Sequence, residues 1–204
     1  MPRKLWTNLA LCFAYGLIMP FSVRGTARGS EPTIHVRVID SDTGDPLAAR
    51  LYLTSSEGKS FYFDCDAPDA SAVRYAKQNW INKNSVEYHT TVSATPCAAV
   101  VPAGKYQLTV ERGKSYFPHV ETVIVGKENV NLTVQMKRWA DPQSRDWYSG
   151  DTHLHRTIDE LRNVIVAEDL NVALPLTNWV TIAEVAPRAG NKNETEIPDG
   201  FCLL

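Results

Sequence analysis

Two histidines in the C-terminal quarter of the chain are the residues best suited to chemistry. His153 and His155 lie in the segment GDTHLHR, two and four positions after Asp151. Side chains two positions apart on a strand point to the same face, so both imidazoles and the carboxylate can face one site while Leu154 points into a core. Two imidazoles on one face can together bind one divalent metal ion, such as zinc, manganese or iron. The alternative is a solvated strand end whose histidines cap backbone groups.

Three short segments are expected to position this pair. Residues 146–155 are predicted to form a strand, and Thr157 with Glu160 matches a capping box, which starts a helix. Residues 171–177 form a short apolar run that predicts a second strand. The order β-α-β implies parallel strands and an α/β segment. The apolar face of the helix is predicted to consist of Ile158, Leu161, Ile165 and Leu170.

The region before this unit has the pattern of short strands. Ile34, Val36 and Val38 alternate with the residues between them, and the turn-forming segment DSDTGDP follows. Residues 70–80 are predicted to form one short helix. Regular strands separated by turns indicate a mainly β protein with a β-sandwich. Further strands are predicted at residues 47–54, 61–63, 98–101, 106–111, 118–125 and 130–136.

These motifs together resemble a known family of metal-dependent hydrolases. DWYSGDTHLHR, followed by a capped helix containing AEDLNV, resembles the start of the PHP (polymerase and histidinol phosphatase) domain, whose first strand ends in an HxH metal motif. VIDSDTGDPLAARLYL and VPAGKYQLTVERGKSY resemble the immunoglobulin-like, carboxypeptidase-regulatory-like sandwich. Such a sandwich precedes the PHP domain in CehA/McbA-type metallohydrolases of bacteria.

The resemblance implies a distorted β/α barrel that binds divalent ions at the carboxyl ends of its strands. There a metal-activated water attacks a phosphoester or related ester bond of a small-molecule substrate. Carried over by position, His153 and His155 are the first metal ligands. Asp151 shares their strand face and can act as a further ligand or orient an imidazole. Arg156 either faces substrate or caps the strand end.

The end of the second predicted strand departs from the family pattern. Many PHP domains have an Asp-His pair followed by Asn there, whereas this chain has Asn178 and Trp179. Asn178 offers a neutral oxygen donor, and Trp179 can line a pocket but cannot bind a metal. One expected imidazole is therefore missing from the implied metal site.

The expected domain organisation leaves the PHP segment incomplete. We expect a signal peptide at residues 1–29, a sandwich at 30–138 with an insertion at about 64–96, a linker at 139–146 and the first β-α-β part of a PHP-type domain at 147–204. Such a fragment supplies only about half of the ligands that a metal needs, so we expect little or no catalysis. The alternative function is a non-catalytic, extracytoplasmic binding or accessory protein with a vestigial metal-site segment.

The start of the chain has the order of segments found in secretory signal peptides. Arg3 and Lys4 precede an apolar run from Leu9 to Phe21, and small residues follow. The run contains Pro20 and is shorter than the roughly 20 residues that span a bilayer. We therefore expect export to the periplasm or the extracellular space, with no stable membrane span after cleavage near Ala27. A retained anchor and a cytosolic protein are the alternatives.

Export changes the interpretation of the cysteines. Cys65 and Cys97 flank one polar, turn-rich segment, and a disulfide between them would contribute about 2 to 4 kcal/mol to stability. A zinc site made of cysteines is not expected, because no pair has close spacing.

Composition and the remaining polar and aromatic residues suggest no further site. With 22% charged residues and a net charge of -2, the chain has no basic excess that would favour nucleic acid. Surface positions are predicted for Glu168, Asp169, His35, His89 and His119. Packing at the domain junction is predicted for Trp139, Trp147 and Tyr148.

Overall fold

The computed structural model describes residues 31–65, 69–78, 84, 86–154, 156–175 and 202–203. The predicted signal peptide and three predicted site residues, His155, Asn178 and Trp179, lie outside the described residues. None of the described helices has the length and apolar character needed to cross a bilayer.

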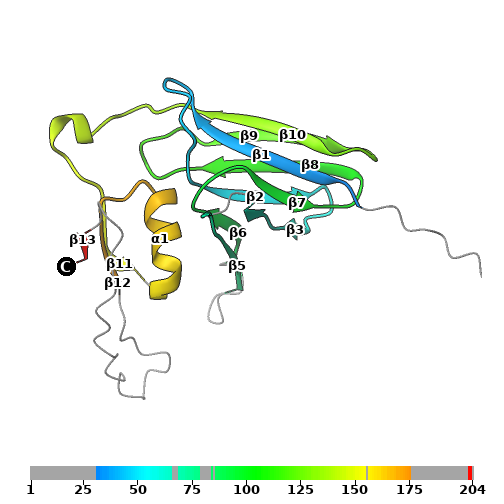
Figure 1. Cartoon of the computed structure of the whole chain (residues 1–204). Coiled ribbons are helices and arrows are strands. Elements are labelled where there is room, and N and C mark those ends of the chain that lie inside the picture. The colour runs from blue at the N-terminus through cyan, green and yellow to red at the C-terminus, as the bar shows by residue number, and fades with distance from the viewer. Residues whose placement is uncertain are drawn as a thin grey trace, which may run out of the picture. The chain divides into compact units, whose positions relative to one another are not determined.

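Two β-sheets face each other in a sandwich (Figure 1). The first sheet contains, in spatial order, β10 (Val130–Met136), β1 (Thr33–Asp40), β7 (Cys97–Val100) and β4 (Asp64–Cys65). The second contains β5 (Ala72–Gln78), β6 (Val86–Val92), β2 (Ala49–Ser55), β8 (Gly104–Glu111) and β9 (His119–Val125), with β3 (Ser60–Phe61) beside β2. The prediction of a mainly β protein with a two-sheet sandwich is confirmed.

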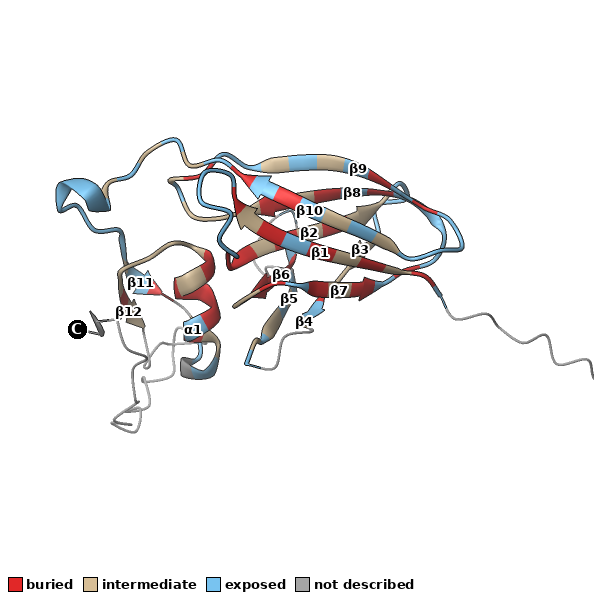
Figure 2. Ribbon diagram, turned by 45° about the horizontal axis from the view of Figure 1, so that its top comes forward, coloured by how far each residue is buried: buried red, intermediate tan, exposed pale blue. Residues whose placement is uncertain are grey.

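The core of the sandwich follows the period-2 pattern of the sequence. Ile34, Val36 and Val38 of β1 are fully buried, and the residues between them are half-buried or exposed (Figure 2). They pack with the inward side chains of the second sheet, such as Leu51 and Leu108. Because a shift of one residue would turn these side chains to the solvent, the buried face fixes the register of β1.

The prediction of a helix at residues 70–80 is wrong, because Ala72–Gln78 forms the strand β5. It pairs antiparallel with β6, which places Tyr75 opposite His89 with their ring centroids 5.4 Å apart. The weak helix propensity of the segment is overridden by this cross-strand pairing. Residues 64–96 thus supply β4 to the first sheet, and β5 and β6 to the second.

The predicted β-α-β order is present after the sandwich. β11 (Gly150–Leu154) pairs parallel with β12 (Val172–Pro175), and α1 (Ile158–Ala167) connects them. β13 (Cys202–Leu203) pairs parallel with β12, and a short 3-10 helix, η1 (Gln143–Arg145), lies in the segment before β11.

Local signals and a small apolar cluster explain where α1 begins and what it buries. At its start, the backbone N–H of Thr157 donates to the carboxylate of Glu160 over 3.4 Å, as the capping box requires. Leu161, Val164 and Ile165 pack with Leu154 and Ala173 of the two strands.

Candidate functional site

The end of β11 carries the predicted metal ligand that the structure describes. His153 is exposed, and its backbone N–H donates to Oδ1 of Asp151 over 2.9 Å. The aspartate therefore stabilises the backbone at this strand end. Arg156, two residues beyond β11, places its guanidinium 3.8 Å from the ring centroid of Tyr75. This is a cation–π contact with β5.

An imidazole and a carboxylate at one strand end are ligand types that suit zinc or manganese. Within the described ranges, however, no three His, Cys, Asp or Glu side chains come together as a metal site. The second predicted ligand, His155, is not among the described residues. Metal binding by His153 and His155 therefore stays a prediction.

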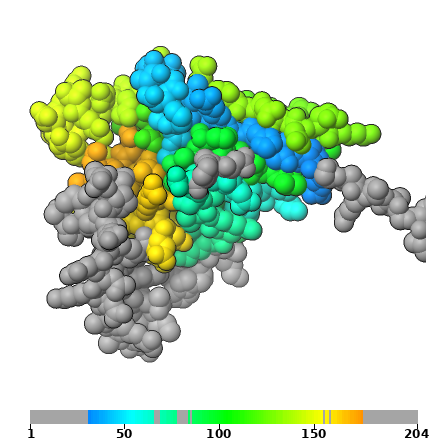
Figure 3. Space-filling model, in the orientation of Figure 1, coloured from blue at the N-terminus to red at the C-terminus, as the bar shows by residue number. Residues whose placement is uncertain are grey.

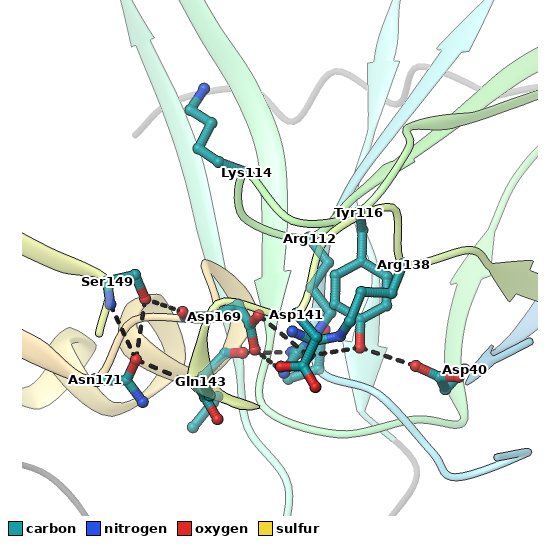
Figure 4. A network of polar contacts seen from close by, with 12 residues as sticks. Asp40, Arg112, Lys114, Tyr116, Arg138, Asp141, Gln143, Ser149, Asp169 and Asn171 are labelled. Atoms are coloured by element: carbon teal, nitrogen blue, oxygen red, sulfur yellow. Dashed lines mark hydrogen bonds and ion pairs between the residues drawn. The ribbon is translucent and has the colours of Figure 1, made fainter. Parts of the chain in front are cut away.

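A buried charged contact joins the sandwich to the turn after α1 (Figure 4). Arg112, directly after β8, donates to Oδ1 of Asp169 over 2.8 Å, and the two side chains are only 13% and 11% exposed. Arg138, after β10, approaches Oδ2 of the same carboxylate at 3.3 Å. We call these three residues the Asp169 junction. Arg112 also donates to the backbone carbonyl of Ala48 at 2.8 Å and to that of Val166.

The Asp169 junction continues into the sandwich through a tyrosine. Arg138 donates to the hydroxyl of Tyr116, which donates to Asp40, both over 2.9 Å. Burial alone would raise the pKa of Asp40. Hydrogen bonds from the backbone of Asp42, from Tyr116 and from the backbone of Thr43, together with the charge of Arg138, outweigh burial and lower that pKa. Asp40 is thus held as a carboxylate at the end of β1.

A second ion pair lies beside the Asp169 junction. Arg50 of β2 pairs with Glu168 and also donates to the hydroxyl of Tyr52 at 3.1 Å. Burial would lower the pKa of Arg50, but Glu168 raises it by more, so the guanidinium remains charged. The prediction that Glu168 and Asp169 are solvated surface residues is therefore wrong. Their partners are distant in the sequence: Arg50 and Glu168, for example, are separated by 118 positions. No local sequence pattern could therefore have predicted these pairs.

A buried amide fixes α1 against β5 and β6, and Figure 3 shows the helix lying against these strands. Asn163 is 2% exposed, and its Nδ2 donates to the backbone carbonyls of Ser71 at 2.8 Å and Thr91 at 3.1 Å. Its Oδ1 accepts from the Ser71 hydroxyl at 2.7 Å. An amide held by three hydrogen bonds allows one orientation of the helix.

A cleft of about 270 Å³ lies next to these ion pairs. Its walls include the cations Arg50, Arg112 and Lys114 and the anions Glu111 and Glu168. Arg50 already pairs with Glu168 and Arg112 with Asp169, so neither guanidinium offers the cleft an uncompensated charge for an anion.

Comparison with known proteins finds a distant likeness to bacterial pilins, of which this chain spans less than half the length. No family model matches the chain, and no curated protein matches it significantly. The group B streptococcus pilus 2b backbone protein is 20% identical, with 53% of this chain and 41% of that chain covered and a TM-score of 0.34. A minor pilin of Streptococcus agalactiae is 18% identical, with 55% and 46% covered and a TM-score of 0.34. The likeness is too distant to indicate a shared function.

The aromatic residues predicted to pack the junction are at the surface instead. Trp139, Trp147 and Tyr148 are 60%, 72% and 66% exposed. The Trp139 indole N–H donates to the backbone carbonyl of Lys114 at 2.9 Å, which holds the ring in place. The prediction is wrong because ion pairs and the Asn163 amide, not aromatic packing, make the contact between the sandwich and α1.

His89 is a buried residue that sequence reasoning placed at the surface. It is 1% exposed and lies between the rings of Tyr52 and Tyr75, with centroid distances of 5.3 and 5.4 Å. Its Nδ1 is buried and has no hydrogen-bond partner. Burial, followed by the positive charges of Arg50 and Arg156, lowers the pKa of His89 to about 4.

Stability should therefore depend on pH through His89. As the pH falls from 6.5 to 4, the unfolded chain takes up a proton on this histidine before the folded protein does, so folding stability is lost over that window. The expected loss is about 3 kcal/mol, and it should be absent in His89→Gln, which stays neutral. Urea denaturation between pH 4.5 and 7.5 measures it. A His89→Gln variant that keeps the wild-type slope of stability against pH would contradict this assignment.

Proposed function

We propose that this chain is an exported, non-catalytic β-sandwich module of the binding or accessory type, which holds a β-α-β unit in a fixed position. The observation that supports this role is the Asp169 junction, where two arginines that follow strands of different sheets, β8 and β10, bind one carboxylate. Charged hydrogen bonds of this kind are short and directional, so they specify one arrangement. Export is inferred from the basic, apolar and small-residue order of residues 1–29.

The junction reaches the start of β11 through the backbone. The Ser149 hydroxyl donates to the carbonyl of Asp169, and the backbone N–H of Asn171 donates to the carbonyl of Ser149 at 2.9 Å. These contacts fix the residue just before β11, and the parallel pairing with β12 fixes the direction of the strand. In this proposal the sandwich therefore sets where the opposite end of β11, with His153, is presented.

The second candidate is the front part of a PHP-type metal-dependent hydrolase. The position of His153 favours it, because the histidine is exposed at the carboxyl end of a parallel strand, where α/β enzymes build their sites. His153 and His155 would hold a divalent metal, with Asp151 behind them. When bound, such a metal supplies an activated water and stabilises negative charge on a phosphoester. Arg156, Asn178 and Trp179 are the residues proposed to face the substrate.

A titration with zinc and with manganese, followed by an assay with bis(p-nitrophenyl) phosphate, separates the two candidates. For the accessory module we expect weak metal binding that a His153→Ala/His155→Ala variant loses, and no hydrolysis by either protein. A His35→Ala/His119→Ala variant is the matched control and should bind metal like the wild type. Hydrolysis that depends on both His153 and His155 would overturn the non-catalytic proposal, and unchanged binding in the first variant would refute the metal pair.

A further inference from the structure

Two cysteines lie directly opposite each other in the first sheet. β4 and β7 are antiparallel, and their register pairs Cys65 with Cys97. Opposite residues of an antiparallel pair point to the same face, with Cα atoms about 4.5 or 5.5 Å apart. Both values lie within the roughly 4.4 to 6.8 Å that a disulfide spans. The backbone is thus already arranged for a bond between these residues.

We propose that Cys65 and Cys97 form a cross-strand disulfide that locks the strands on which α1 rests. Cys97 is fully buried and Cys65 is half-buried, so an external disulfide such as oxidised glutathione reaches Cys65 first. The Cys65 thiolate attacks it and releases one thiol, and Cys97 then displaces the second. Overall, two protein thiols lose two protons and two electrons, and the external disulfide is reduced to two thiols.

Each thiol makes a hydrogen bond that the disulfide would replace. As thiols, Cys65 and Cys97 donate to the backbone carbonyls of Ala94 and Val36, each over 3.7 Å. Such sulfur hydrogen bonds are weak, so their loss would cost little.

The disulfide would affect the contact with α1, because the strands that contact this helix lie between the two cysteines in the sequence. The closed loop of about thirty residues contains β5 and β6. It includes Ser71 and Thr91, whose carbonyls hold the Asn163 amide of α1. It also includes Thr90, whose hydroxyl accepts the backbone N–H of Phe63, next to β4, at 3.0 Å. A constraint on this loop therefore favours the arrangement that binds the helix, an effect that rests on the holding role proposed above.

The test compares the full chain after equilibration with oxidised and with reduced glutathione. Peptide mapping without reduction should find Cys65 linked to Cys97. Reduction should lower the melting temperature by about 5 °C or more, and should speed hydrogen exchange in β6 and α1 roughly thirty-fold or more. Cys65→Ser should show none of these responses, whereas the matched variant Cys202→Ser should show all of them.

Three results would overturn the proposal. Thiols that persist at both positions in oxidised glutathione, or a link from either cysteine to Cys202, would rule out the bond. A bond whose reduction leaves hydrogen exchange in α1 unchanged would rule out its effect on the helix. The peptide map does not depend on the holding role, so failure of the proposed function leaves that result intact and the two failures can be told apart.

Discussion

Replacing Asp169 with asparagine should lower the free energy of unfolding by about 2 to 4 kcal/mol. The carboxylate lies between Arg112 and Arg138, and its loss takes from two partly buried guanidinium groups the anion that they share. Asparagine keeps the size of the side chain. It also tolerates the left-handed backbone of Asp169, where φ is 55°, so the effect reports on charge rather than on strain.

Asp141→Asn is the matched control for this substitution. Asp141 is exposed in the linker, where its Oδ1 accepts the backbone N–H of Ser144 at 3.4 Å, and its replacement should change stability by less than about 0.5 kcal/mol. Guanidinium denaturation measures both variants. Adding Arg112→Met to Asp169→Asn should cost less than the sum of the single changes, because the two side chains interact. Equal losses in Asp169→Asn and Asp141→Asn would show that the Asp169 junction does not hold the two parts together.

Replacing Gly113 with alanine should cost about 3 kcal/mol or more. Gly113 has a φ of 49°, and a Cβ there would lie 2.2 Å from the carbonyl oxygen of Glu168. Because that atom belongs to the backbone at the end of α1, the clash cannot be relieved by turning a side chain. The turn after α1 would have to move away from the sandwich, which would also separate the neighbouring ion pairs.

The control Gly58→Ala shows how much of the loss in Gly113→Ala comes from the positive φ alone, without a steric clash. Gly58 also has a positive φ, 82°, but a Cβ there meets no atom within 4 Å, so only the conformational cost of about 1 kcal/mol should appear. Denaturation curves give the two losses, and hydrogen exchange should show α1 loosened only in Gly113→Ala. A Gly113→Ala variant that is no less stable than Gly58→Ala would mean that the close approach to Glu168 is not required.

Local sequence signals predicted most helices and strands. They failed where contacts with residues distant in the sequence determine the secondary structure. The alternation of Ile34, Val36 and Val38 identifies β1, and the capping box identifies the start of α1, because both patterns are complete within a few residues. β5 was mistaken for a helix because its pairing with β6 cannot be seen within the segment. Its identity as a strand depends on contacts such as that of Tyr75 with His89.

The candidate site shows the same division. The strand position of His153 follows from its own neighbours, so it could be predicted. The Asp169 junction could not, because Arg112 and Asp169 are 57 positions apart and each looks like an ordinary surface charge in sequence. Likewise, nothing near His89 in the sequence indicates that two tyrosine rings flank it and that the charges of two arginines act on it. Co-variation between such positions is the signal that could have found these contacts.

The parallel pairing of β1 with β10 has a mechanical consequence. Seven successive residue pairs, from Ile34 with Val130 to Asp40 with Met136, join the first and last strands of the sandwich. Because these strands run in the same direction, the chain enters the sandwich at one end and leaves it at the other (Figure 1). Tension between the two ends would load all the hydrogen bonds between β1 and β10 together in shear, rather than opening them one after another. The parallel pairing of β1 with β10 should therefore resist a pulling force by shear, without its hydrogen bonds opening in sequence.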